Sequence, residues 1–202
     1  MLYDYFDINS YDEVILYGHS TGGLIVTLYQ FETKNKINKI ILNAPWLNYK
    51  FNNFDYYIFH YFYYYIIPYI PEYDLINRSF EDNKYMISLS EKFIIDKLFK
   101  KNYITPVIST WFRNIIKYQN DIFHKKIWLK YPTLALISDH TAEHKGSKKG
   151  DEILDINEHV KQLEKLGNNK LVLVKDATHD VLSSHYEYAI EQSLSEIKNF
   201  LL

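Results

Sequence analysis

The chain of 202 residues contains no cysteine, which excludes disulfide bonds, thiolate zinc sites, iron–sulfur clusters and a cysteine nucleophile. It also lacks an excess of basic residues: 23 Lys and Arg against 25 Asp and Glu give a net charge of −2, which argues against nucleic-acid binding. The first residues, MLYDYFDINSYDE, lack the apolar segment of a signal peptide, so we expect a cytoplasmic protein. The charge-free stretch at 56–70 has 15 residues, fewer than the about 18 that a membrane span needs.

The sequence does contain four short apolar runs that predict buried strands. Each run is continuous rather than alternating, as expected for parallel strands that are covered on both faces. The runs are 14–17 (VILY), 37–42 (INKIIL), 133–137 (TLALI) and 171–174 (LVLV). Helical patterns lie between and after them, so the sequence predicts an α/β fold, a mainly parallel sheet flanked by helices.

Three segments have apolar residues at the spacing of an amphipathic helix. They cover about residues 24–31, 156–163 and 186–201. The second has clear boundaries, because Asp155 and Glu158 form a capping box at its start and Gly167 is a stop signal. We expect the third to open with a capping box made by Ser184 and Glu187.

The alternation of strands and helices is interrupted between residues 48 and 130. Aromatic side chains dominate residues 49–73, and Thr105-Pro106 predicts the start of a further helix. We therefore predict one core domain, residues 1–47 and 131–202, with a mostly helical, aromatic-rich insertion at 48–130.

Residues 18–23 (GHSTGG) form a G-x-S-x-G motif between the first predicted strand and the first predicted helix. A serine at so sharp a turn has a strained backbone, and we expect Gly18 and Gly22 to be glycines because a Cβ there would collide with the turn. The turn directs the backbone N–H of Thr21 toward the position of an oxyanion. Ser20 is therefore the candidate nucleophile. A phosphate loop is the alternative, but it favours a lysine after the glycines, where Leu24 stands.

A serine hydroxyl becomes an effective nucleophile only when a base accepts its proton and an acid orients that base. After the fourth strand, residues 176–180 (DATHD) place His179 where the base is expected; His185, at the start of the final helix, is the rival. The acid is expected in the loop after the third strand. Three residues there are candidates: Asp139 at the strand end, Asp151 after a polar loop, and Asp155, which already has a structural task as a helix cap.

Residues 140–144 (HTAEH) match the H-x-x-E-H pattern of a class of zinc peptidases. That chemistry needs both histidines on one helical face together with a distant third ligand. Here the segment lies in a polar loop after a predicted strand. We therefore predict neither a metal site nor an organic cofactor.

Residues 18–23, 151–155 (DEILD) and 178–180 (THD) together resemble the nucleophile, acid and histidine motifs of the α/β-hydrolase superfamily. The resemblance is to the group of monoacylglycerol lipases, lysophospholipases and serine aminopeptidases, and it covers about residues 11–202. It implies an α/β-hydrolase fold whose triad is Ser20, His179 and Asp151, with Thr21 as an oxyanion donor. It also implies that residues 48–130 form a helical cap.

The resemblance implies a fold that is truncated at its N-terminus. Members of the superfamily have about 70–100 residues, with four further strands, before the nucleophile strand, whereas 13 residues precede Val14 here. The loop that supplies a second oxyanion N–H would then be missing. The strand at 14–17 would become an apolar sheet edge, which residues 1–10 or a partner polypeptide would cover.

These features predict a serine hydrolase that cleaves carboxylic esters, including lipid esters, through an acyl-serine intermediate. Two alternatives stay open: a peptidase or amidase with the same triad, and a catalytically impaired relative that acts as a binding module or is a non-functional fragment. The expected partner is a small ester or lipid substrate. The tyrosine-rich cap is expected to contact a membrane surface or, alternatively, to serve only as core packing.

Overall fold

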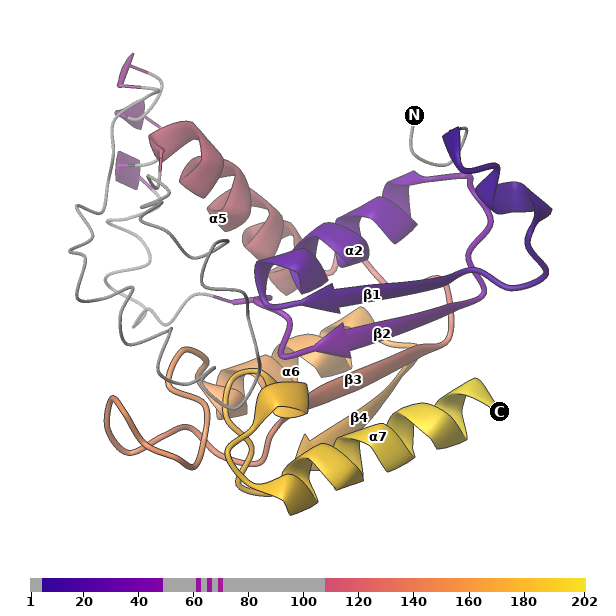
Figure 1. The fold of residues 1–202 in the computed structure, drawn as a ribbon. Helices are drawn as coiled ribbons and strands as arrows, with labels where there is room; N and C mark the ends of the chain where they lie inside the picture. Colours follow the sequence, from indigo (N-terminus) through magenta and orange to yellow (C-terminus); the bar gives the residue numbers. More distant parts are fainter. Residues whose placement is uncertain (1–4, 49–60, 63–64, 67–68, 71–107) are drawn as a thin grey trace. The chain divides into compact units, whose positions relative to one another are not determined.

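The structure is a computed structural model that describes residues 5–48, 61–62, 65–66, 69–70 and 108–202 (Figure 1). It divides into two compact units, Met1–Tyr49 with Gln119–Leu202, and Lys50–Tyr118. The aromatic-rich segment and most of the insertion predicted at 48–130 lie outside the described residues. Helix α5 (Ser109–Phe123) covers the helical pattern that follows Thr105-Pro106. The first unit contains the sheet and every candidate residue named above.

Four parallel strands form one sheet in the order β1-β2-β3-β4 (Figure 1). Their bounds are β1 (Ile15–His19), β2 (Lys39–Asn43), β3 (Thr133–Ser138) and β4 (Asn169–Val174). Every residue of β3 is buried, which explains why its central residues, 134–137, are continuously apolar rather than alternating. The predicted parallel sheet is therefore confirmed, with each strand within two residues of its apolar run.

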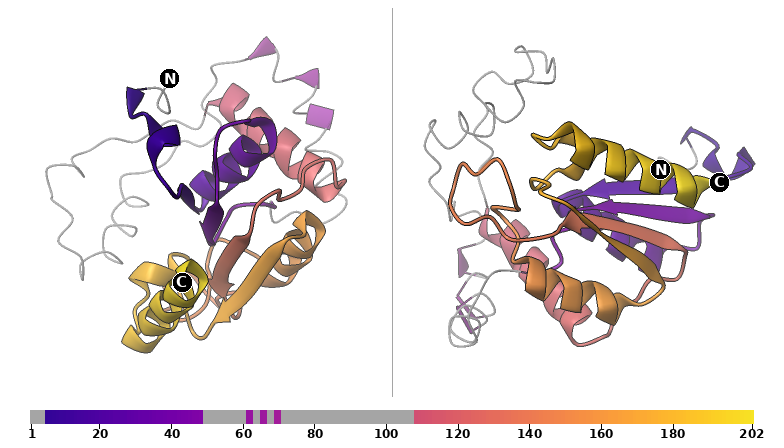
Figure 2. Two further views of the ribbon diagram at one scale, coloured as in Figure 1. Left: turned by 90° about the vertical axis from the view of Figure 1, so that its right-hand side faces the viewer. Right: turned by 90° about the horizontal axis from the view of Figure 1, so that it is seen from below.

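Helices cover both faces of the sheet. Helices α2 (Thr21–Glu32) and α6 (Ile156–Leu166) lie on one face, and α7 (Glu187–Leu201) lies on the other (Figure 2). The α6 boundaries are those the sequence predicts. The Asp155 carboxylate accepts a hydrogen bond from the N–H of Glu158 at 3.3 Å, and Gly167 follows the last turn with a φ of 63°.

The start of α7 differs from the prediction. The helix begins at Glu187, with Tyr186 at the N-cap and no hydrogen bond from its side chain. The hydroxyl of Ser184 instead accepts a hydrogen bond from the N–H of Thr178 at 3.1 Å and donates one to the carbonyl of Asp180 at 3.4 Å. The predicted capping box is wrong because this hydroxyl is engaged by the loop between β4 and α7.

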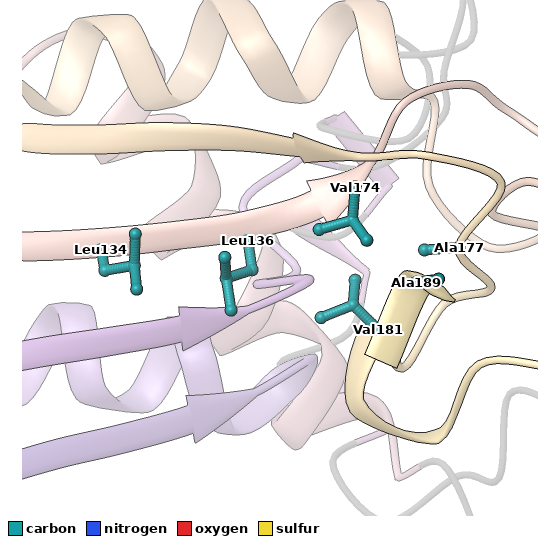
Figure 3. Close-up of a cluster of buried hydrophobic side chains, with 6 residues drawn as sticks. All are labelled: Leu134, Leu136, Val174, Ala177, Val181 and Ala189. Carbon is teal, nitrogen blue, oxygen red and sulfur yellow. The ribbon is translucent and has the colours of Figure 1, made fainter. Parts of the chain in front are cut away.

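A buried apolar cluster fills the space between the sheet and α7 (Figure 3). Its members come from β3, β4, the following loop and α7: Leu134, Leu136, Val174, Ala177, Val181 and Ala189, all fully buried. Ala177 and Val181 lie two residues before and two residues after His179. Burial of a valine side chain alone is worth about 1.5 kcal/mol, so this packing holds the loop in one conformation.

In the described part of the chain, β1 pairs with β2 alone and forms one edge of the sheet. Its side chains Ile15 and Tyr17 are 36% and 49% exposed. The expected apolar edge is therefore present, and its cover by a partner polypeptide stays a prediction. None of the described helices is both long enough and apolar enough to cross a lipid bilayer.

Candidate active site

Ser20 occupies the turn that joins β1 to α2. Its φ of 51° and ψ of −120° are strained for a residue with a side chain, as the sequence predicts. Backbone hydrogen bonds hold the turn: the N–H of Ser20 donates to the carbonyl of Asn43 at 3.0 Å, and its carbonyl accepts from the N–H of Gly23 and of Trp46. Ser20 stands at the N-cap of α2 without capping it, so its hydroxyl is available for another partner.

Two glycines allow the turn to close, but they are not the pair expected from the motif. A Cβ on Gly18 would lie 2.6 Å from the carbonyl oxygen of Gly22, and a Cβ on Gly23 would lie 2.5 Å from the Cβ of Pro45. A Cβ on Gly22 would have no neighbour within 4 Å. The expectation is therefore correct for Gly18 and wrong for Gly22, because α2 approaches the segment after β2 at Gly23.

We expect opposite effects from alanine at the two neighbouring glycines. Gly23→Ala should lower the free energy of unfolding by about 1–3 kcal/mol, because Pro45 must move to admit the methyl group. Gly22→Ala should leave stability unchanged or raise it by up to about 1 kcal/mol, because alanine favours the helix. Urea unfolding of both variants measures the difference. Equal destabilisation would contradict the assignment of the close contact to Gly23.

The structure brings Ser20, His179 and Asp151 together. The Nε2 atom of His179 lies 2.9 Å from the Oγ of Ser20, and its Nδ1 lies 2.9 Å from the Oδ2 of Asp151. A carboxylate only accepts hydrogen bonds, so Nδ1–H donates to Asp151 and Nε2 is left to accept the proton of the Ser20 hydroxyl. The three side chains thus form one directed chain of hydrogen bonds.

Asp151 is fully buried, and its surroundings favour the carboxylate in one orientation. Its Oδ1 accepts hydrogen bonds from the N–H groups of Ile153 and Leu154, both at 2.8 Å, while Oδ2 faces His179. The preceding Gly150 has a φ of 79°, and a Cβ there would lie 2.8 Å from the backbone of Ala142. Position 150 therefore requires glycine, because only glycine allows the segment before Asp151 to pack this closely against Ala142.

The rival residues have other partners. The Oδ1 of Asp139 lies 2.6 Å from the Nδ1 of His140 and accepts from the N–H of Asp176 at 3.0 Å. Asp155 caps α6, and the ring of His185 packs edge-on against Tyr186 with 5.1 Å between centroids. Residues 140–144 form no helix, so His140 and His144 are not on the helical face that a zinc peptidase uses.

The backbone N–H of Thr21 is suited to an oxyanion. Thr21 is the first residue of α2, so its N–H belongs to the first turn, whose N–H groups have no acceptor within the helix. The positive end of the helix dipole lies at the same place. Any negative charge that develops beside Ser20 would therefore face N–H donors.

Sequence reasoning missed a group of residues beside His179. The ring of His19 lies 5.2 Å from that of His179, between centroids, and burial lowers the pKa of His19. Asn43 and Asp180 also lie there and are joined by a hydrogen bond of 2.6 Å. Asp180 is next to His179 in the sequence, but nothing in the sequence places the end of β2 beside it.

A buried histidine on α6 gives stability a dependence on pH. His159 is 2% exposed, and its Nδ1–H donates to the carbonyl of Asp155 at 2.9 Å. Burial lowers its pKa, against the opposing effects of the Asp155 carbonyl and the Asp151 carboxylate. The unfolded chain, with a histidine pKa of about 6.5, therefore binds this proton more readily than the folded protein does.

We expect the free energy of unfolding to fall as the pH drops below about 6.5. His159→Asn keeps a donor for the Asp155 carbonyl but removes the group that binds the proton. The variant should therefore lose less of its free energy of unfolding between pH 7.5 and pH 5 than wild type does. His124→Asn, at an exposed histidine, is the control and should leave the loss unchanged. Urea unfolding at both pH values tests this, and identical slopes for His159→Asn and wild type would contradict it.

A parallel sheet with a serine on a strand–turn–helix bend, followed in the chain by an acid and then a histidine, is the arrangement of the α/β hydrolases. The sequence model of the family described as serine aminopeptidase, S33, matches residues 5–184. Since the match covers most of the chain, the chain belongs to this family of α/β hydrolases. No curated protein sequence matches it.

Solved structures show the same fold. The monoacylglycerol lipase of Paleococcus ferrophilus is 19% identical, with a TM-score of 0.66 over 99% of this chain and 72% of that one. A soluble variant of monoglyceride lipase from Saccharomyces cerevisiae is 14% identical, with a TM-score of 0.62 over 99% of this chain and 67% of that one. A thermophilic esterase from Thermogutta terrifontis is 12% identical, with a TM-score of 0.54 over 98% of this chain and 69% of that one.

Proposed function

We propose that the protein is a serine hydrolase that cleaves carboxylic esters through an acyl-serine intermediate. The observation that carries the proposal is the chain of two 2.9 Å hydrogen bonds from Ser20 through His179 to Asp151. These residues come from three separate segments of the sequence, and a buried carboxylate orients the imidazole toward a hydroxyl on a strained turn. This geometry has the parts that activation of a serine requires.

In the proposed mechanism, the Oγ of Ser20 attacks the carbonyl carbon of the ester while the Nε2 of His179 accepts the hydroxyl proton. The N–H of Thr21 donates to the oxyanion of the tetrahedral intermediate. The imidazolium then donates its proton to the leaving alcohol, and the acyl group stays on Ser20. A water molecule that loses a proton to His179 then attacks the acyl carbon; the bond from that carbon to the Oγ of Ser20 breaks, His179 returns the proton to Oγ, and the carboxylic acid is released. Asp151 stays ionised and orients His179 throughout.

The choice of an ester as substrate is supported by the solved structures that share the fold, two of which are named as monoglyceride lipases and one as an esterase. The family description, serine aminopeptidase, supports an amide bond as the second candidate. Both reactions use the same nucleophile and base. The leaving group separates them, because an amine must be protonated before it can leave.

Purified protein tests the proposal directly. We expect a fluorophosphonate probe to label the protein at Ser20, as located by mass spectrometry, and short-chain and long-chain 4-nitrophenyl esters to be hydrolysed faster than an aminoacyl 4-nitroanilide. Faster cleavage of the anilide would favour the aminopeptidase. If the folded protein neither reacts with the probe nor cleaves either substrate, the proposed function is wrong and the impaired relative is favoured.

A further inference from the structure

We propose that Asn43 is a positioning residue of the proposed hydrolase, and that it fixes His179 relative to Ser20 by hydrogen-bonding both the turn that carries the serine and the loop that carries the histidine. Asn43 is the last residue of β2 and is fully buried. The inference rests on the proposed function, because it concerns the activity of the same site.

The side chain of Asn43 holds the histidine loop. Its Nδ2 donates to the Oδ1 of Asp180 at 2.6 Å, and its Oδ1 accepts from the N–H of Val181 at 3.2 Å. Asp180 directly follows His179, so these two bonds fix the backbone on the carboxyl side of the imidazole. The hydrogen bond to the Asp180 carboxylate is the stronger of the two, because a hydrogen bond to a charged group is roughly twice as strong as a neutral one.

The main chain of Asn43 holds the nucleophile. Its carbonyl accepts a hydrogen bond from the N–H of Ser20 at 3.0 Å. One residue therefore contacts the backbone of the serine and the two residues that follow the histidine. Since β2 lies in the interior of the sheet between β1 and β3, it is a rigid reference for both.

The amide has only one orientation that satisfies its neighbours. The second proton of Nδ2 points to the hydroxyl oxygen of Tyr17, 2.8 Å away on β1, so both protons and the carbonyl oxygen of the side chain are used. Rotating the amide by 180° would place its oxygen against the Asp180 carboxylate and its nitrogen against the N–H of Val181. Both contacts would be repulsive, so the position of the loop is set without ambiguity.

The amino side of the histidine loop has separate supports. The N–H of Asp176 donates to Asp139, and the carboxylate of Asp176 accepts from Tyr188 at 2.6 Å and from Lys149 at 3.3 Å. These contacts do not involve the turn at Ser20. Loss of the Asn43 side chain should therefore leave the loop attached but allow His179 to move relative to the serine.

The first test compares two fully buried amides, each of which makes three side-chain hydrogen bonds. Asn43→Leu keeps the branched shape and the number of heavy atoms in the side chain and removes its three hydrogen bonds. Gln30→Met is the matched control: Gln30 is also fully buried and makes three side-chain hydrogen bonds, to Thr27, Trp128 and Lys130, away from Ser20 and His179. We expect Asn43→Leu to lower kcat and the rate of fluorophosphonate labelling by on the order of a hundredfold with little change in KM, since a shift of about 1 Å costs that much.

Both variants should be destabilised in urea, but Gln30→Met should keep a kcat near that of wild type under conditions where it is folded. If Asn43→Leu keeps the wild-type kcat, or if Gln30→Met loses as much, the inference is wrong. If wild type itself neither labels nor turns over substrate, the proposed function fails first, and the two failures are thereby distinguished.

The second test decides the matter even if Asn43→Leu does not fold. Asn43→Asp alone sets one carboxylate against that of Asp180, and we expect a loss of kcat at least as large as that of Asn43→Leu. In the double variant with Asp180→Asn, the amide at position 180 can donate to the carboxylate at position 43, so the hydrogen bond is restored with its direction reversed. The pair again carries a single negative charge. We expect the double variant to recover at least tenfold of the lost kcat. A double variant no more active than Asn43→Asp would overturn the proposal.

Discussion

Ser20→Ala should abolish labelling by a fluorophosphonate and lower the kcat for ester hydrolysis by about 10⁶-fold, the scale seen when a nucleophile of this kind is removed. The physical reason is that the variant lacks the atom that forms the acyl bond. The hydrogen-bond chain ends at that atom, the Oγ that lies 2.9 Å from His179. Labelling followed by mass spectrometry, together with steady-state rates on a 4-nitrophenyl ester, measures the loss.

The matched control is Ser193→Ala. Ser193 is fully buried, and its hydroxyl donates to the carbonyl of Ala189 within α7 rather than to any of the three candidate residues. This variant should keep its kcat. Labelling of Ser20→Ala at the rate of wild type would remove Ser20 from the mechanism, whatever the behaviour of the control.

Asp151→Asn should lower kcat by on the order of 10⁴-fold while the protein stays folded. The amide oxygen can still accept from the N–H groups of Ile153 and Leu154, which now bind Oδ1. The amide nitrogen would then face the Nδ1 of His179 and require it to accept a hydrogen bond. The imidazole would carry its proton on Nε2, where it can no longer take the proton of the Ser20 hydroxyl.

The two rival aspartates give this prediction its contrast. Asp155→Asn keeps a good N-cap and loses only the charge at the start of α6, so it should cost at most about 1 kcal/mol of stability, with little change in kcat. Asp139→Asn weakens the contact with the N–H of Asp176 and should have an effect on kcat far below that of Asp151→Asn. Steady-state kinetics of the three variants ranks them, and a larger loss for either rival would move the acid to that residue.

Elements that depend on local pattern could be predicted from the sequence. The four strands are recognisable as short apolar runs, and coverage on both faces explains this for the interior strands β2 and β3, which are buried at nearly every position. Helix α6 has recognisable boundaries because Asp155 and Gly167 act within a single turn. The bend at Ser20 could likewise be predicted from neighbouring residues, because glycines flank a serine between a predicted strand and a predicted helix.

Features that depend on contacts between distant segments could not be predicted in this way. The need for glycine at position 23 rather than 22 comes from Pro45, and the engagement of Ser184 comes from Thr178. Local pattern sets Asp155 apart as a helix cap but leaves Asp139 and Asp151 as candidates for the acid, and only the resemblance to a known group favours Asp151. Asn43 has no signal at all, because its role arises from the pairing of β2 with β1 and from the position of Asp180 above it.

Ala177 and Val181, on either side of His179 in the sequence, are buried in the hydrophobic core (Figure 3). The loop that carries the imidazole is therefore anchored by core packing on both sides of His179. We therefore do not expect the proposed base to be lost by fraying of a loop while the rest of the domain stays intact, since its release would expose the packed residues of β3 and β4. Heat inactivation and cooperative melting would then be one event.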